Sequence, residues 1–161
     1  MTIAEGDMLP EATFRIMGPN GIEALSAKDV FGGKKVVLFA VPGAFTPTCH
    51  LKHMPGFVEA ADAFKAKGVD EVVCLAVNDP FVLSAWGEAT GAAGKVTILS
   101  DGNAEFTKKI GMDFDGGGVG LGTRSKRYAM VVEDGTVKML RIEENPGVAE
   151  VSAAEAILAA L

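Results

Sequence analysis

The stretch KVVLFAVPGAFTPTCHLKHMPGF, residues 35–57, contains in succession a strand, a loop and the start of a helix. Its first part, Lys35 to Val41, is almost wholly apolar, which is typical of a strand buried on both faces of a sheet. Apolar residues then recur at helical spacing from about Thr48 to Lys67, and Gly68 is placed to end that helix. Cys49 therefore falls where the strand has ended and the helix begins.

The segments on either side of this stretch continue the alternation of strands and helices. Before it, Asn20-Gly21 between two apolar runs predicts a hairpin from Ala12 to Leu25. The further elements predicted are a short helix from the N-cap Ser26 to Phe31, a strand Glu71–Val77, a helix from Asp79 and Pro80 to Thr90, a strand Val96–Leu99, a helix Ala104–Ile110, strands Tyr128–Val132 and Val137–Ile142 around Asp134-Gly135, and a last helix opened by a capping box of Ser152 and Glu155. This order predicts an α/β fold, with a central mixed sheet flanked by helices and an N-terminal β-hairpin, in a single domain over residues 1–161.

Composition excludes two classes of partner. The chain of 161 residues carries a formal net charge of -6, whereas a nucleic-acid surface needs clustered Lys and Arg. No stretch approaches the roughly 18 consecutive apolar residues of a membrane helix, and the first residues carry acids where a secretory signal carries basic ones. We therefore expect a cytoplasmic protein that binds neither nucleic acid nor membrane.

The glycine-rich run DGGGVGLGT, Asp115 to Thr123, invites comparison with a phosphate-binding loop. It contains no G-x-G-x-x-G frame, no Gly-Lys-Ser/Thr follows it, and no clear strand precedes it. We interpret it as a surface loop.

Cys49 is the residue with the clearest chemical role. At the start of a helix its sulfur meets unpaired amides and the positive end of the helix dipole, both of which favour the reactive thiolate. Thr46 stands where a C-x-x-C motif would have its first cysteine, so a dithiol switch is excluded and a hydroxyl is available instead. With Pro42, which restrains the backbone and shields the approach, these residues form the pattern P-x-x-x-T-x-x-C.

The segment from Val41 to Phe57 resembles the active-site segment of the peroxiredoxin-5 or type II subfamily of the peroxiredoxins. The resemblance extends through LAVNDPFVLSAWG (75–87) and KRYAMVVEDGTVK (126–138), in the family's order and spacing. It implies a thioredoxin-like fold and a peroxidase that reduces hydrogen peroxide and organic hydroperoxides through a cysteine sulfenic acid, with no metal and no other cofactor.

The resemblance also assigns roles to four residues. Cys49 would be the peroxidatic cysteine, Thr46 the hydroxyl that orients the peroxide, and Pro42 the residue that closes the pocket. Arg127, which opens the run RYAMVV, would donate to the peroxide and stabilise the thiolate, as a fixed cation within reach would. Arg124 is the competing choice, and alignment with the family on Arg-aromatic-x-Met favours Arg127.

Cys74 leaves two reductive cycles open. A cysteine in an apolar strand such as EVVCLAV is usually an inert core residue, and then glutathione or glutaredoxin would reduce the sulfenic acid directly. In plant type II members a cysteine at the corresponding position is the resolving one, and then local unfolding would bring Cys74 to Cys49 and thioredoxin could reduce the disulfide.

The remaining candidates lie beside the site. His50 and His53 next to Cys49 are zinc-type ligands, but the chain offers too few partners for a metal site, and we expect His53 on an exposed or interfacial side of its helix. Phe45, Phe81 and Leu83 are either core residues or, as the resemblance implies, candidates for the contact of a homodimer.

Two further functions remain as alternatives. A thioredoxin-fold reductase or isomerase would need the vicinal dithiol that Thr46 removes. A non-catalytic thiol redox sensor or chaperone-like module would use an oxidised Cys49 to signal to a partner protein, and slow consumption of peroxide without turnover would support it.

Overall fold

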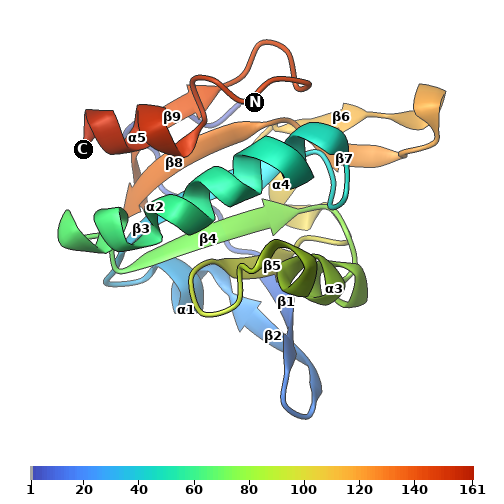
Figure 1. Cartoon of the computed structure of the whole chain (residues 1–161), viewed down its shortest axis with the longest axis horizontal. Helices are drawn as coiled ribbons and strands as arrows, with labels where there is room; N and C mark the ends of the chain where they lie inside the picture. Colours follow the sequence, from blue (N-terminus) through green and yellow to red (C-terminus); the bar gives the residue numbers. More distant parts are fainter. Residues whose placement is uncertain (1) are drawn as a thin grey trace.

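A seven-stranded mixed sheet with the strand order β2-β1-β5-β4-β3-β8-β9 forms the centre of the computed structural model, which describes residues 2–161 (Figure 1). Its strands are β1 (Thr13–Gly18), β2 (Gly21–Ser26), β3 (Lys35–Val41), β4 (Glu71–Ala76), β5 (Thr97–Ser100), β8 (Tyr128–Glu133) and β9 (Thr136–Ile142). β3, β4 and β5 run parallel, whereas β8 pairs antiparallel with β3, and β1 with β5. The predicted α/β fold with an N-terminal hairpin is confirmed.

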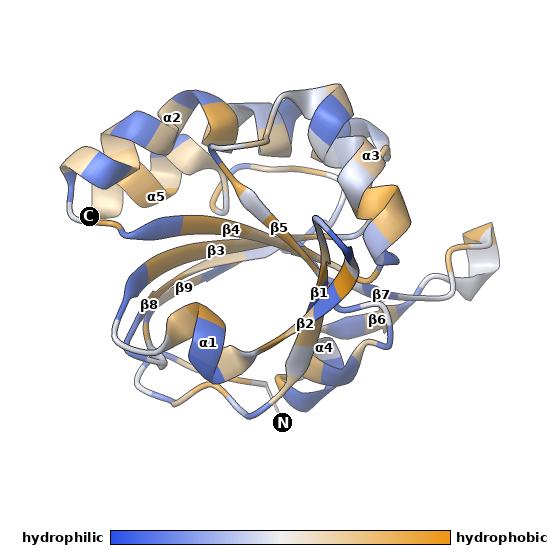
Figure 2. Ribbon diagram, turned by 90° about the horizontal axis from the view of Figure 1, so that it is seen from below, coloured by the Kyte–Doolittle hydropathy of each residue, from blue (hydrophilic) through white to orange (hydrophobic). Residues whose placement is uncertain are grey.

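Helices cover both faces of this sheet (Figure 2). They are α1 (Ala27–Phe31), α2 (Met54–Ala66), α3 (Pro80–Thr90), α4 (Glu105–Lys109) and α5 (Ala154–Ala160). α2, α3 and α5 pack on one face and α1 and α4 on the other. Covering both faces explains why β3 is apolar throughout, because Val37, Phe39 and Val41 enter one core while the residues between them enter the other.

Capping residues define the starts of α1 and α3, at the positions predicted from the sequence. The Ser26 hydroxyl accepts from the Asp29 amide at 3.0 Å, and the Asp29 carboxylate accepts from the Ser26 amide at 2.9 Å, which forms a capping box for α1. Asp79 caps α3 by accepting from the Val82 amide at 2.9 Å, and the helix ends at Gly91 in the left-handed conformation. Both predicted helix starts are confirmed.

The predicted capping box at the last helix is wrong. α5 begins at Ala154 and has Ala153 as its N-cap, with no side-chain hydrogen bond there. The Ser152 hydroxyl instead donates to the Glu143 carboxylate at 2.6 Å. Glu143 also accepts from the Ser152 amide at 2.8 Å, and it thereby takes the donor that a capping box would pair with Glu155.

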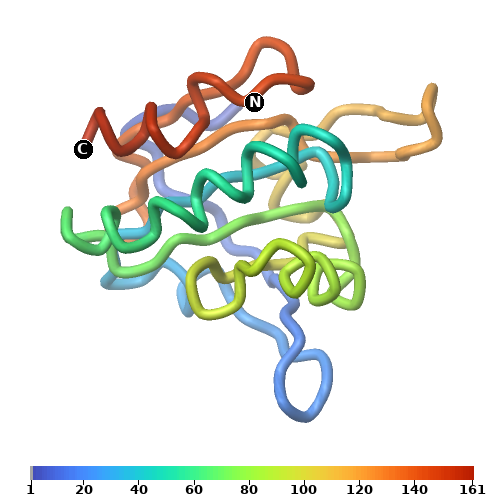
Figure 3. The backbone as a smooth tube through the Cα atoms, viewed as in Figure 1, coloured from blue at the N-terminus to red at the C-terminus, as the bar shows by residue number. Residues whose placement is uncertain are grey.

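The glycine-rich run lies at the surface, as predicted, but it has more structure than a loop. β6 (Asp113–Asp115) and β7 (Thr123–Ser125) form a separate two-stranded sheet, and a 3-10 turn, η2 (Gly117–Val119), lies between them. This hairpin projects from the body of the molecule (Figure 3). Within residues 2–161, no helix is long and apolar enough to cross a bilayer.

Candidate active site

Cys49 lies at the start of the helix that follows β3. The His50 amide donates to the Thr46 carbonyl at 2.9 Å, so helical bonding begins before Cys49, and Cys49–His53 form a π-helical turn, η1, that leads into α2. Such turns are frequent at functional sites. The Cys49 side chain is fully buried, so a peroxide must be small or the surrounding loop must move for it to reach the sulfur.

Arg127 is the residue that the fold brings to this sulfur. In the antiparallel pairing of β3 and β8, Ala40 lies opposite Tyr128, which places Arg127 level with the end of β3. Its Nη2 donates to Cys49 Sγ at 2.9 Å, and its side chain is buried. A cation that donates to sulfur favours the thiolate over the thiol.

His53 holds the other side of the Arg127 guanidinium. Arg127 Nη1 lies 2.8 Å from His53 Nδ1, and His53 Nε2 lies 2.9 Å from the Ser152 carbonyl. Because a guanidinium only donates, Nδ1 must accept and Nε2 must carry the proton. The pKa of His53 is lowered to about 4, mainly by burial and also by the positive charge of Arg127, against the opposing hydrogen bond to Ser152.

The expectation that His53 lies on an exposed or interfacial side is wrong. Its side chain is 1% exposed and its ring packs against Phe39 and Phe57 with centroid distances of 5.0 and 5.5 Å. His53 lies on the side of the helix that contacts both Arg127 and Phe39 of β3. Neither contact can be inferred from the residues next to His53 in the sequence.

The loop before Cys49 is held by a hydrogen bond within the loop and by another from Arg124. The Thr46 hydroxyl donates to the Gly43 carbonyl at 2.7 Å, which leaves its oxygen free to accept a further bond. Pro42 is buried, and its carbonyl accepts from Arg124 Nη1 at 3.1 Å. Arg124 therefore contacts the loop that carries Pro42 and Thr46, whereas Arg127 contacts the sulfur.

Cys74 lies in β4 beside Phe39 of β3 and faces the same core as Cys49. Both cysteines are buried free thiols. Burial raises the pKa of the Cys74 thiol, and a negative Cys49 would raise it further, against the opposing charge of Arg127. Cys74 is therefore held as a neutral thiol while the fold stays closed.

The aromatic candidates divide between surface and core. Phe45 is 51% exposed and Phe81 is 63% exposed. Leu83 is 2% exposed within its own chain, so it is a core residue and has almost no surface for a second subunit. Of the two interpretations of Leu83, the structure supports the core residue, because α3 turns this side toward the sheet.

His50 lies on the outer side of the same helical turn. The indole of the buried Trp86 donates to His50 Nδ1 at 3.0 Å, and the Phe45 ring stacks on His50 at a centroid distance of 5.6 Å. No group of three or more metal-type ligands occurs among residues 2–161. His50 and His53 thus serve as hydrogen-bond partners of the protein itself.

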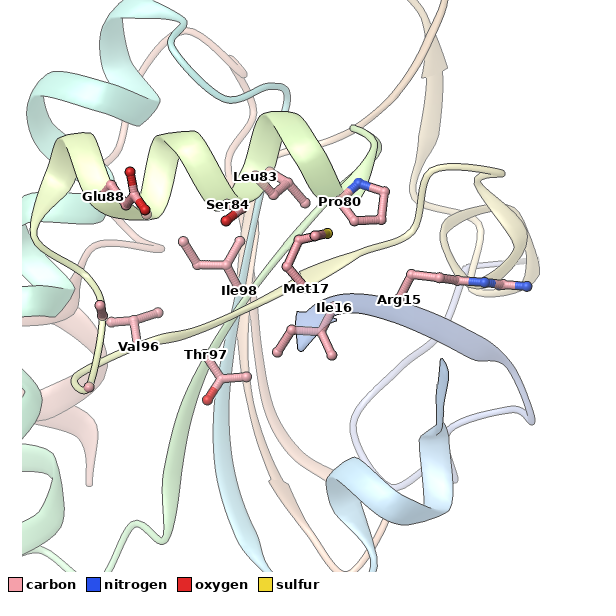
Figure 4. A pocket seen from close by; sticks show the side chains of 13 residues that line it. Arg15, Ile16, Met17, Pro80, Leu83, Ser84, Glu88, Val96, Thr97 and Ile98 are labelled. Atoms are coloured by element: carbon pink, nitrogen blue, oxygen red, sulfur yellow. The ribbon is translucent and has the colours of Figure 1, made fainter. Parts of the chain in front are cut away.

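A groove elsewhere on the molecule does not belong to this site. It has a volume of about 370 Å³, lies between β1, α3 and β5, and is lined by residues such as Met17, Ser84 and Ile98 (Figure 4). Neither Cys49 nor Arg127 borders it. The site is therefore a buried sulfur with its partners rather than an open cleft.

Sequence reasoning missed the segment between β9 and α5. The Pro146 carbonyl accepts from Arg127 Nε at 2.9 Å, and the Ser152 carbonyl binds His53. Each carbonyl lies far along the chain from the side chain that it binds, 19 residues for Pro146 and Arg127 and 99 residues for Ser152 and His53. No local sequence pattern marks a backbone carbonyl as part of a site. Only the short spacing from Cys49 to His53 was visible beforehand.

Comparison with known proteins shows which family this chain is similar to. The family model described as Redoxin matches residues 4–158. Peroxiredoxin-2E-2 of the chloroplast of Oryza sativa subsp. japonica is 48% identical over 165 residues, which covers 99% of this chain and 73% of that protein. Peroxiredoxin-2B of Arabidopsis thaliana is 44% identical over 160 residues and covers 99% of this chain and 98% of its own.

Solved structures give the same result. The crystal structure of reduced Prx3 from Vibrio vulnificus in complex with H2O2 has a TM-score of 0.94 and 50% sequence identity, and the match covers 99% of each chain. The expected thioredoxin-like peroxiredoxin fold is confirmed. The chain therefore belongs to the Redoxin family and, within it, to the peroxiredoxins, which are thiol-dependent peroxidases.

Proposed function

We propose that Cys49 is the peroxidatic residue and that it reduces hydrogen peroxide and organic hydroperoxides with the help of Arg127, Thr46 and Pro42. The observation that supports this best is the 2.9 Å contact from Arg127 Nη2 to Cys49 Sγ in a buried site. No carboxylate among residues 2–161 lies within ion-pair distance of Arg127. The Cys49 thiolate is then the natural counter-ion of this buried guanidinium.

The reaction follows from these contacts. The Cys49 thiolate attacks the terminal oxygen of the hydroperoxide, a sulfur–oxygen bond forms and the oxygen–oxygen bond breaks. Cysteine is oxidised to the sulfenic acid, and the leaving oxygen takes up a proton to become water or an alcohol. Arg127 stabilises the negative charge that moves from sulfur to the leaving oxygen.

Thr46 and Pro42 act on the substrate rather than on the sulfur. The Thr46 hydroxyl donates its hydrogen bond to the Gly43 carbonyl, so its oxygen can accept a hydrogen bond from the O–H of the bound hydroperoxide. The buried Pro42 ring limits access of water to the thiolate. Cys49 is recessed, which favours small peroxides over bulky ones.

The reductant depends on Cys74. If Cys74 is structural, glutathione or glutaredoxin attacks the sulfenic acid, with loss of water, and a second thiol releases Cys49. If Cys74 is resolving, its thiol attacks the Cys49 sulfenic acid after local unfolding, water leaves as the disulfide forms, and thioredoxin reduces this disulfide. The raised pKa of the buried Cys74 thiol favours the first route in the closed fold. Both reductants are consistent with a single domain that works in the cytoplasm.

The experiment that tests the proposal is peroxide consumption by wild type, Cys49→Ser and Cys74→Ser, each with thioredoxin and thioredoxin reductase and, separately, with glutathione and glutaredoxin. We expect Cys49→Ser to lose turnover with both systems. Cys74→Ser keeps turnover with glutathione if Cys74 is structural and loses thioredoxin-driven turnover if it is resolving. Full activity of Cys49→Ser would contradict the proposal.

A further inference from the structure

The segment 144–152, which joins β9 to α5, presents three backbone carbonyls to side chains around Cys49. The donors are Arg127 Nε to Pro146 at 2.9 Å, the Thr48 hydroxyl to Gly147 at 2.7 Å, and His53 Nε2 to Ser152 at 2.9 Å. Two of these three donors, Arg127 and His53, also bond to each other. The orientation of the guanidinium beside the sulfur therefore depends on where this segment places its carbonyls.

The Glu143 carboxylate in turn folds this segment. One of its oxygens accepts from the Ser152 hydroxyl at 2.6 Å, from the Ser152 amide at 2.8 Å and from the Glu150 amide at 2.7 Å. Glu143 is buried, and its own amide donates to the Arg127 carbonyl at 3.0 Å, so the carboxylate starts from a fixed point beside β8.

The ionised form of Glu143 is the one that these bonds require. Burial favours the neutral acid, but hydrogen bonds from Ser152 and Glu150 outweigh burial and hold the pKa of the Glu143 carboxyl below its usual range. At neutral pH the carboxylate can accept all three donors at one oxygen, whereas a neutral amide in its place is a weaker acceptor.

We propose that Glu143 is a positioning residue for the peroxidase reaction, because it folds segment 144–152 so that the Pro146 and Ser152 carbonyls hold Arg127 and His53 against Cys49. This rests on the proposed function of Cys49 and Arg127. Glu143 acts on the sulfur only through other groups. When the segment loosens, Arg127 loses its bond to Pro146 and His53 loses its bond to Ser152, and the donor at Cys49 Sγ is no longer fixed.

Glu143→Gln tests this proposal, with Glu144→Gln as the matched control. Both variants change the net charge equally at adjacent positions, but Glu144 is exposed and its carboxylate makes no hydrogen bond or ion pair within residues 2–161. Both would be made in a Cys74→Ser background, so that Cys49 is the one thiol that reacts. The measurement is the rate of sulfenic acid formation with hydrogen peroxide across a range of pH, followed by mass spectrometry, together with urea unfolding.

We expect Glu143→Gln to react about tenfold more slowly at neutral pH, with its rate profile displaced to higher pH because the thiolate is less well stabilised. Glu144→Gln should match the parent in its rate at neutral pH and in the pH profile of that rate. A Glu143→Gln variant that is less stable in urea but keeps the parent rate and pH profile would overturn the proposal. If the parent and Glu144→Gln also fail to react, the proposed function itself is wrong.

If Glu143→Gln does not fold, Ser152→Ala would be used in its place. This change removes the hydroxyl donor and keeps the Ser152 amide bond to Glu143. We expect a smaller loss of rate and a displacement of the pH profile in the same direction. Parent behaviour of a folded Ser152→Ala in both measurements would then count against the proposal.

Discussion

Arg127 brings a positive charge into a core where each of its hydrogen bonds has a definite partner. Its Nε, Nη1 and Nη2 contact Pro146, His53 and Cys49. A buried charge is costly unless it is paired and hydrogen-bonded, so this arrangement is stable when the sulfur is negative. The same contacts that retain the guanidinium therefore favour the reactive form of the cysteine.

Two amide variants of His53 separate its two hydrogen bonds. His53→Asn can place its carbonyl oxygen near the Nδ1 position and still accept from Arg127, whereas His53→Gln reaches the Nε2 position and can donate to Ser152 but offers Arg127 no acceptor. We expect the Asn variant to react with hydrogen peroxide several-fold faster than the Gln variant, measured by stopped flow. The opposite order would show that the bond to Ser152 matters more than the bond to Arg127.

The stability of the fold should depend on pH through His53. Its pKa is about 4 in the folded chain and about 6.5 when unfolded, so the unfolded state binds the proton first as pH falls. The free energy of unfolding should decrease between about pH 6.5 and pH 4, by up to about 3 kcal/mol, and this contribution is intact above that range. Arg127 and Glu143 are the charged groups that act on His53, and the lowered pKa of Glu143 keeps its carboxylate ionised over most of this pH range.

Urea unfolding at several pH values measures this effect. His53→Asn has no ionisable group at this position, so its stability should change less over the same range. Parallel curves for wild type and His53→Asn would contradict the assignment of the effect to His53.

At the scale of elements, the loop between β3 and η1 is held at both its carbonyls and its amides. Arg124 donates to Pro42, Thr46 to Gly43, and the Ala44 amide to Asn78 Oδ1 at 2.9 Å. Phe45 has a φ of 63°, a left-handed backbone conformation that a residue other than glycine adopts only when neighbouring contacts impose it. Contacts from Arg124 and Asn78 therefore support the conformation of this loop.

Gly43→Ala tests the contact of Arg124 with this loop. A Cβ at Gly43 would overlap the end of the Arg124 side chain, which is flexible and can swing away, and it would also lie 3.3 Å from Thr46 Cγ2. We expect a stability change within about 1 kcal/mol but a several-fold slower reaction with hydrogen peroxide, because the Pro42 carbonyl loses its donor. Gly118→Ala is the control, since nothing lies within 4 Å of the added carbon. Equal rates for the two variants would show that Arg124 does not support the site.

At the scale of the whole molecule, Phe45 and Phe81 are exposed apolar residues on two segments around the site, and Leu51 of η1 is exposed as well. Phe45 lies in the active-site loop and Phe81 in the first turn of α3. If a homodimer buries them, Phe45→Ser with Phe81→Ser should shift the chain to a monomer in sedimentation equilibrium. Val119→Ser, at the exposed glycine-rich turn, should leave the oligomeric state in sedimentation equilibrium unchanged. A monomeric wild type would contradict the predicted dimer.

The order of strands and helices and the core of the site were predictable because their signals are local. Strand β3 is marked by its continuous apolar run, α3 by Asp79 and Pro80, and Cys49 by its place after Thr46 and Pro42. The capping box at Ser152 was mispredicted, because Glu143, nine residues earlier in the chain, accepts from the Ser152 amide that a capping box would pair with Glu155.

The sequence by itself determined the fold class, the position of Cys49 at a helix start and, through family resemblance, the choice of Arg127 over Arg124. The tertiary structure alone decided that His53 is buried, that Leu83 belongs to the core and that segment 144–152 holds the guanidinium. These contacts join residues 19 to 99 positions apart. Local propensity carries no information about such pairs, because they form only when β8 pairs with β3 and the chain after β9 folds back onto α2.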